Sequence, residues 1–161
     1  MICMKKQYWK TYAFWILLAE GVGALSGWLT REGTKLYQQT VIQPPLSPPP
    51  VVFPIVWAVL FALMGIGAAR VYLSPASAAR SRGLLLFFVQ LAFNFLWSVF
   101  FFNLQAFGFS FVWLVTLWLL IAWMTVTFWQ VDKAAALLQL PYLLWVAFAG
   151  WLNLGVWLLN R

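Results

Sequence analysis

Long apolar runs separated by short polar breaks organise this chain, and they predict membrane-spanning helices. A helix needs about 20 consecutive apolar residues to cross the hydrocarbon core of a bilayer. No charged residue occurs from Gly83 to Val131, and at about 1.5 Å per residue this stretch is too long for one crossing. We place its turn in the segment FFNLQAFG, residues 101–108. The whole pattern predicts five spans, near residues 9–29, 51–69, 83–102, 107–130 and 134–158.

The apolar runs are continuous and do not alternate with polar residues, so they predict helices and not the strands of a β-barrel. We therefore expect an all-α, integral membrane five-helix bundle that forms a single domain over residues 1–161. The first run is long and contains Glu20. For this reason we expect it to be kept as a span and not removed as a signal peptide.

The composition agrees with a protein surrounded by membrane lipid. The chain is 65% hydrophobic and only 8% charged, and its mean hydropathy is +0.88. A soluble domain is about 45–50% apolar and about 25% charged. The net charge of +7 comes from ten lysines and arginines in several short segments, so we expect no nucleic-acid partner. The chain has no histidine and three acidic residues, which leaves few candidates for metal binding or acid–base catalysis.

The positive charges predict an orientation, because cytoplasmic loops carry an excess of lysine and arginine. With a cytoplasmic N-terminus, seven cations lie inside: Lys5, Lys6, Lys10, Arg70, Arg80, Arg82 and Lys133. Three lie outside: Arg31, Lys35 and Arg161. We therefore expect the N-terminus inside and the first loop outside. The single cysteine, Cys3, excludes an internal disulfide.

The first loop, about residues 30–50, is the only long connection that the pattern predicts. Its segment QPPLSPPP, residues 43–50, contains five of the eight prolines of the chain. Adjacent prolines favour a stiff, extended path, and such a segment could form a lid over the helix ends. Proline is also well placed in the first turn of a helix, so the segment could be a spacer that starts the second span. The residues alone favour neither alternative.

Polar and aromatic side chains share two helical stripes within the predicted spans. The first stripe, in the third span, consists of Gln90, Asn94 and Trp97. The second, in the fifth span, consists of Tyr142, Trp145, Ala149 and Asn153. The asparagines could serve only for hydrogen bonds between helices, which contribute about 0.6 kcal/mol each. Two stripes that both carry tryptophan favour an aromatic-lined ligand cavity in the bundle interior.

Glu20 is the only acidic residue well inside a predicted span. Such a residue could carry protons or bind a cation. It could equally be a neutral carboxylic acid that donates a hydrogen bond to a neighbouring helix. The pairs Gly23/Gly27 and Gly65/Ala69 permit close helix approach, either within the bundle or between two copies of the chain.

Three sequence motifs, which follow one another along the chain, resemble those of one protein family. They are PPVVFPIVWAVLFALMG at 49–65, QLAFNFLWSVFFF at 90–102 and PYLLWVAFAGWLN at 141–153. Over about residues 20–160 the chain resembles the TspO/translocator protein family, also called tryptophan-rich sensory proteins. This resemblance implies a five-helix bundle, usually a homodimer, with a pocket that opens toward the first loop.

The resemblance also implies a ligand and a set of pocket residues. The ligands of family members include porphyrins such as protoporphyrin IX, with no obligatory cofactor. The implied pocket positions are Tyr37, Trp57, Asn94, Trp97, Trp145 and Ala149. We add Tyr142 from its helical stripe, and Leu46 because relatives usually carry a tryptophan at that place in the loop.

These features predict a membrane receptor, sensor or carrier for tetrapyrroles, expected in a bacterial cell membrane. Relatives with a tryptophan at the place of Leu46 could degrade porphyrin in light, but leucine does not readily give up an electron. We therefore do not expect this chain to be an enzyme. The alternative function is a proton-coupled exporter of aromatic cations that uses Glu20, because small multidrug transporters also place one glutamate in a tryptophan-rich first helix.

Overall fold

The computed structural model describes residues 2–161, and the side chains of residues 8–161. Five helices in this part of the chain are long and apolar enough to cross a membrane, at Tyr8–Leu29, Val52–Leu73, Ala78–Asn103, Phe107–Val131 and Lys133–Leu159. The predicted five-helix membrane bundle is therefore confirmed. The side chains of Cys3, Lys5 and Lys6 lie outside the described residues.

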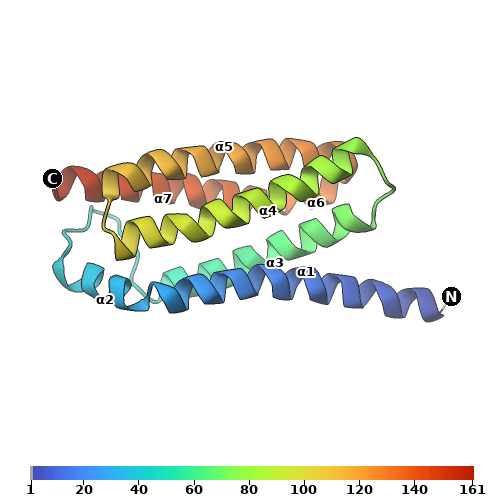
Figure 1. Ribbon diagram of the computed structural model, residues 1–161, viewed down its shortest axis with the longest axis horizontal. Coiled ribbons are helices and arrows are strands. Elements are labelled where there is room, and N and C mark those ends of the chain that lie inside the picture. Colours follow the sequence, from blue (N-terminus) through green and yellow to red (C-terminus); the bar gives the residue numbers. More distant parts are fainter. Residues whose placement is uncertain (1) are drawn as a thin grey trace.

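The helices run up and down along one long axis (Figure 1). Their order is α1 (Ile2–Leu29), α2 (Arg31–Thr40), α3 (Val52–Leu73), α4 (Ala78–Ser98), the π-helical turn η1 (Val99–Asn103), α5 (Phe107–Val131), α6 (Lys133–Leu137) and α7 (Leu140–Leu159). Because the number of crossings is odd, the two termini lie at opposite ends of the bundle. The short helix α2 lies at the same end as the C-terminus.

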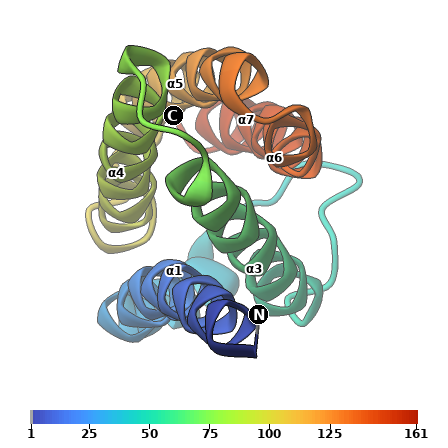
Figure 2. The ribbon, with the colours of Figure 1, turned by 90° about the vertical axis from the view of Figure 1, so that its right-hand side faces the viewer.

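The helices pack in two groups. α1 packs mainly against α3, whereas α5 packs against both α4 and α7 (Figure 2). α3 makes only a few contacts with α7 and more with α6, because it crosses the bundle obliquely (Figure 1). α3 therefore diverges from α7 toward the end that carries α2.

The closely packed core lies toward the other end. Met64, Phe87, Leu117, Ile121 and Phe128 are all completely buried there. Gly65 allows α3 to approach α1, since a Cβ atom at this position would lie 2.7 Å from the carbonyl oxygen of Trp15. This small residue therefore serves packing within the bundle.

An ion pair connects α3 to the turn between α5 and α6. Arg70 Nη2 lies 2.9 Å from Asp132 Oδ2, and Arg70 Nε donates to Asp132 Oδ1 at 3.2 Å. We predicted that the second span ends near residue 69, before the charge of Arg70, but α3 continues to Leu73, and this bidentate pair satisfies the charge within the helix. Burial alone would raise the pKa of Asp132, but hydrogen bonds from the Ala135 N–H and Arg70 lower it below its usual value.

The first loop differs most from the prediction, because half of it is helical. α2 follows α1 after a break at Thr30, whose carbonyl oxygen accepts a hydrogen bond from the Thr34 N–H at 2.8 Å. Gly33 lies directly on η1, since a Cβ atom there would lie 2.6 Å from the Phe102 carbonyl oxygen. In the segment REGTKLYQQT, Gly33, Leu36, Tyr37 and Thr40 lie on one helical face and the charged residues on the opposite face, so the segment has the periodicity of a short amphipathic helix, which our prediction of a loop missed.

Candidate functional site: a cavity under the proline segment

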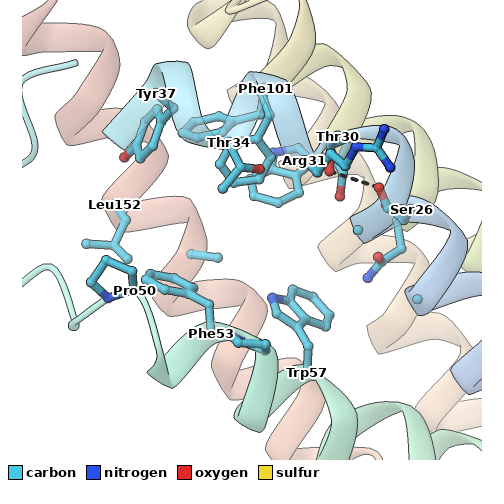
Figure 3. A pocket seen from close by; sticks show the side chains of 18 of the residues that line it. Ser26, Thr30, Arg31, Thr34, Tyr37, Pro50, Phe53, Trp57, Phe101 and Leu152 are labelled. Carbon is cyan, nitrogen blue, oxygen red and sulfur yellow. Dashed lines mark hydrogen bonds between the residues drawn. The ribbon is translucent and has the colours of Figure 1, made fainter. Parts of the chain in front are cut away.

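A cavity of about 630 Å³ lies at the end that carries α2, where α3 diverges from α7. Its wall comes from α1, α2, the proline segment (residues 43–50), α3, α4, η1 and α7. Figure 3 shows Trp57 and Phe53 of α3 on one side of the space, with Tyr37 and Phe101 across from them. The wall is thus mainly aromatic and apolar.

The structure brings together residues that lie far apart in the sequence. Six of the eight predicted site residues line the cavity: Tyr37, Trp57, Asn94, Trp97, Trp145 and Ala149. They lie on four different elements, namely α2, α3, α4 and α7. The other two predicted residues, Leu46 and Tyr142, are not part of its lining.

Tyr142 is completely buried behind the cavity wall. Its hydroxyl donates to Gln90 Oε1 at 2.7 Å and accepts from Asn94 Nδ2 at 2.8 Å. The Gln90 amide in turn contacts the Met64 sulfur at 3.6 Å. This network joins α7, α4 and α3, and it fixes the amide of Asn94 at the edge of the cavity.

A second network holds Trp97. Its indole Nε1 donates to Asn153 Oδ1 at 3.1 Å, and Asn153 Nδ2 donates to the Phe107 carbonyl at 2.9 Å. Both Asn94 and Asn153 therefore make the hydrogen bonds between helices that the sequence suggested, and both also line the cavity. These two residues therefore hold helices together and also line a cavity; that the cavity binds a ligand stays a prediction.

Leu46 points away from the cavity because of the turn that carries it. Ser47 donates to the Pro44 carbonyl, through its N–H at 3.3 Å and its hydroxyl at 2.7 Å. Within this turn Leu46 has φ 67°, and its side chain is 81% exposed. Proline at the second position and a positive φ at the third are typical of a type II turn.

The proline segment closes one side of the cavity through Gln43, Ser47, Pro48 and Pro50. Its start is attached to the end of α7, because the Ile42 N–H donates to Asn160 Oδ1 at 2.9 Å and Asn160 Nδ2 donates to the Ile42 carbonyl at 2.8 Å. Pro44 is buried against Gly155, where a Cβ atom would lie 2.7 Å from the proline. The segment thus forms part of the wall and also leads into α3.

Tyr37 anchors α2 over the cavity. Its ring lies 5.3 Å from that of Phe101 and 5.4 Å from that of Phe102, between centroids. Burial raises the pKa of the Tyr37 phenol to about 12. The hydroxyl therefore stays neutral at physiological pH and can act as a hydrogen-bond donor or acceptor.

Similarity to known proteins agrees with this architecture. The TspO/MBR family matches residues 15–158. The chain belongs to this family. It is 36% identical over 151 residues to the tryptophan-rich protein TspO of Chlorobaculum tepidum, covering 93% of this chain and 96% of that protein.

Two further relatives come from distant organisms. The protein CrtK of Rhodobacter capsulatus is 41% identical over 119 residues, covering 73% of this chain and 74% of CrtK. The translocator protein of Bos taurus is 33% identical over 156 residues, covering 95% of this chain and 92% of that protein. The names of family members support a role as a membrane sensor or receptor.

The sequence patterns missed several cavity residues. Phe53, Phe61 and Phe101 line the cavity, but they occur in phenylalanine-rich spans where most such side chains face lipid or core. Glu20, Gly23 and Gly27 also line it. Their spacing, i, i+3 and i+7, puts them on one helical face, and this signal could have assigned Glu20 to the cavity.

Trp145 leaves a hydrogen-bond donor unused at the cavity. Its indole Nε1 is buried and has no partner among the described residues, whereas the indole nitrogens of Trp97, Trp113 and Trp118 all donate. A buried donor without a partner is costly. In the described part of the chain, no group of three histidine, cysteine or acidic residues could hold a metal ion.

Proposed function

We propose that this membrane protein is a receptor, sensor or carrier that binds tetrapyrroles such as protoporphyrin IX in the cavity under the proline segment. The observation that carries the proposal is the cavity itself, which measures about 630 Å³ and has a mainly apolar wall with eight aromatic side chains among its 28 lining residues. Ligand sites typically measure about 300–1,000 Å³ and are mainly apolar, with a few polar groups that orient the ligand. A flat macrocycle suits such a wall because its faces can stack on aromatic rings.

The polar groups support an orientation for the ligand. The unpartnered Trp145 indole N–H can donate to an acceptor on the ligand. Arg31 lines the cavity at the junction of α1 and α2, and its guanidinium lies 5.2 Å from the centre of the Trp28 ring. The carboxylates of a porphyrin would face this end, where water lowers the cost of their charge.

The assembly and the membrane orientation belong to the same proposal. We expect a homodimer, as the resemblance implies, and a cytoplasmic N-terminus. Among the described side chains, Lys10, Arg70, Arg80, Arg82 and Lys133 are the cations assigned to the inner side. This excess favours the orientation that puts the proline segment outside.

The test is a titration of the purified protein with protoporphyrin IX, followed by the absorbance of the porphyrin. Trp145→Ala should weaken binding about 5- to 150-fold, corresponding to about 1–3 kcal/mol for an aromatic anchor. The matched control is Trp151→Ala, on the same helix but 46% exposed and outside the cavity lining. Equal affinity of wild type and both variants would contradict the proposed site.

A further inference from the structure

Glu20 brings a carboxylate into the cavity from α1. It shares a helical face with Gly23, Ala24 and Gly27, all of which line the cavity. These three residues are small, so no large side chain of this face covers the carboxylate. A Cβ atom at Gly27 would meet nothing within 4 Å, so the space beside Gly27 is open, whereas the Phe61 ring of α3 fills the space beside Gly23.

Glu20 differs from the other two acidic residues because it has no partner. Glu32 lies 3.2 Å from the Lys35 ammonium, and Asp132 is paired with Arg70. Glu20 makes no hydrogen bond or ion pair among the described residues. An unpaired acidic residue within a membrane span is costly, and such residues mark ligand or ion sites.

The nearest cation of the cavity wall does not neutralise Glu20. Arg31 is the one lysine or arginine among the lining residues described, and it follows the end of α1 by two residues. The two side chains are attached roughly 16 Å apart along the helical path, at about 1.5 Å per residue. Arg31 is instead 3.4 Å from Glu32.

Aromatic rings of α3 line the same cavity near the face of α1 that carries Glu20. Phe61 packs directly against Gly23, one helical turn from Glu20. The Trp57 ring lies 5.5 Å from the Phe61 ring, between centroids, and both side chains line the cavity. Aromatic faces attract cations, most strongly where water is excluded.

We infer that the cavity also binds lipophilic cations, with Glu20 as their counter-ion and the Trp57–Phe61 pair as the surface for their apolar groups. This inference rests on the cavity as a ligand site, and not on porphyrin as its ligand. A bound cation supplies the partner that Glu20 lacks in the described structure. Such binding is also what the alternative function, an exporter of aromatic cations, would require.

The test compares a permanent cation with a neutral ligand of the same shape. Tetraphenylphosphonium and tetraphenylsilane are titrated in detergent micelles, by quenching of tryptophan fluorescence, into wild type, Glu20→Gln and Glu32→Gln. Glu32→Gln removes the same charge from an exposed position outside the cavity. We expect at least a tenfold loss of tetraphenylphosphonium affinity in Glu20→Gln only, with equal tetraphenylsilane affinity in all three proteins.

Equal tetraphenylphosphonium affinity in wild type and Glu20→Gln would overturn the inference, and would indicate that Glu20 is a neutral acid. A parallel loss of tetraphenylsilane binding in Glu20→Gln would also overturn it, because the role of Glu20 would then be structural. Protoporphyrin IX is titrated into the same proteins. A wild type that fails to bind porphyrin but binds the cation through Glu20 contradicts the proposed function and supports this inference.

Discussion

Removal of one hydroxyl group should weaken both the fold and the cavity. Tyr142→Phe deletes the group that donates to Gln90 Oε1 at 2.7 Å and accepts from Asn94 Nδ2 at 2.8 Å. The ring stays in place, so the change creates almost no empty volume. The effect should therefore come from hydrogen bonding alone.

Two estimates limit the expected loss in the free energy of unfolding. Two hydrogen bonds between membrane helices contribute about 1.2 kcal/mol at about 0.6 kcal/mol each. A buried polar group left without a partner costs about 1–3 kcal/mol. Gln90 is completely buried and its carbonyl has no other partner among the described residues, whereas Asn94 lines the cavity and could bond to water there. We expect a loss of about 2 kcal/mol in the free energy of unfolding.

The assay is equilibrium unfolding in mixed micelles with an increasing fraction of denaturing detergent. Tyr8→Phe is the matched control, because Tyr8 is 45% exposed near the N-terminus, and its hydroxyl makes no hydrogen bond among the described residues. The control should unfold like wild type. A Tyr142→Phe protein as stable as the control would refute the assigned network.

Three further substitutions test the contact between the proline segment and α7, the turn at Leu46, and the ion pair between Arg70 and Asp132. Gly155→Ala should displace Pro44, since the new Cβ would lie 2.7 Å from it, and limited proteolysis should then cut the proline segment faster than in wild type. Leu46→Gly should raise the free energy of unfolding by about 1 kcal/mol, measured by the same detergent titration, because glycine adopts φ 67° without strain. Asp132 has a lowered pKa in the folded state, so its contribution is present above the ordinary pKa of about 3.9 and is lost as pH falls through the lowered value. Asp132→Asn should therefore reduce the stability of the protein at neutral pH. The stability of this variant should also fall less than that of wild type as the pH is lowered, as melting temperatures measured across pH would show.

The sequence predicted the number of spans and the family because both depend on extended patterns. Long apolar runs without charge leave no alternative to membrane helices, and three ordered motifs carry the resemblance. The stripe of Asn94 and Trp97 indicated an inward-facing side of α4, and both residues line the cavity. A pattern of this kind can be recognised in the sequence because its spacing repeats along one helix.

Single contacts between distant residues could not be predicted. α2 has the periodicity of a short amphipathic helix, but the fit of Gly33 and Tyr37 against η1 could not be read from its sequence. Arg70 stays within α3 because Asp132, 62 residues later in the chain, meets it. Tyr142 belongs to the predicted stripe, but a helical face covers a wide arc and does not distinguish the cavity wall from the core behind it.

The direction of Leu46 depends on one backbone angle. A type II turn at Pro45 and Leu46 turns the side chain outward, and a proline-rich segment offers several turns with similar sequence signals. The resemblance gave the position of this residue in the loop. It did not give the side on which the side chain lies.

The central claim is that the ligand binds in the cavity under the proline segment. A substitution that fills part of this cavity tests the claim most directly. Gly27 and Gly21 both lie on α1, and a Cβ atom at either would meet nothing within 4 Å, but only Gly27 lines the cavity. Gly27→Phe should fill part of the space and lower protoporphyrin IX affinity at least tenfold, while Gly21→Phe should bind like wild type. Equal affinity of these two variants, measured by porphyrin absorbance, would show that the ligand binds elsewhere or not at all.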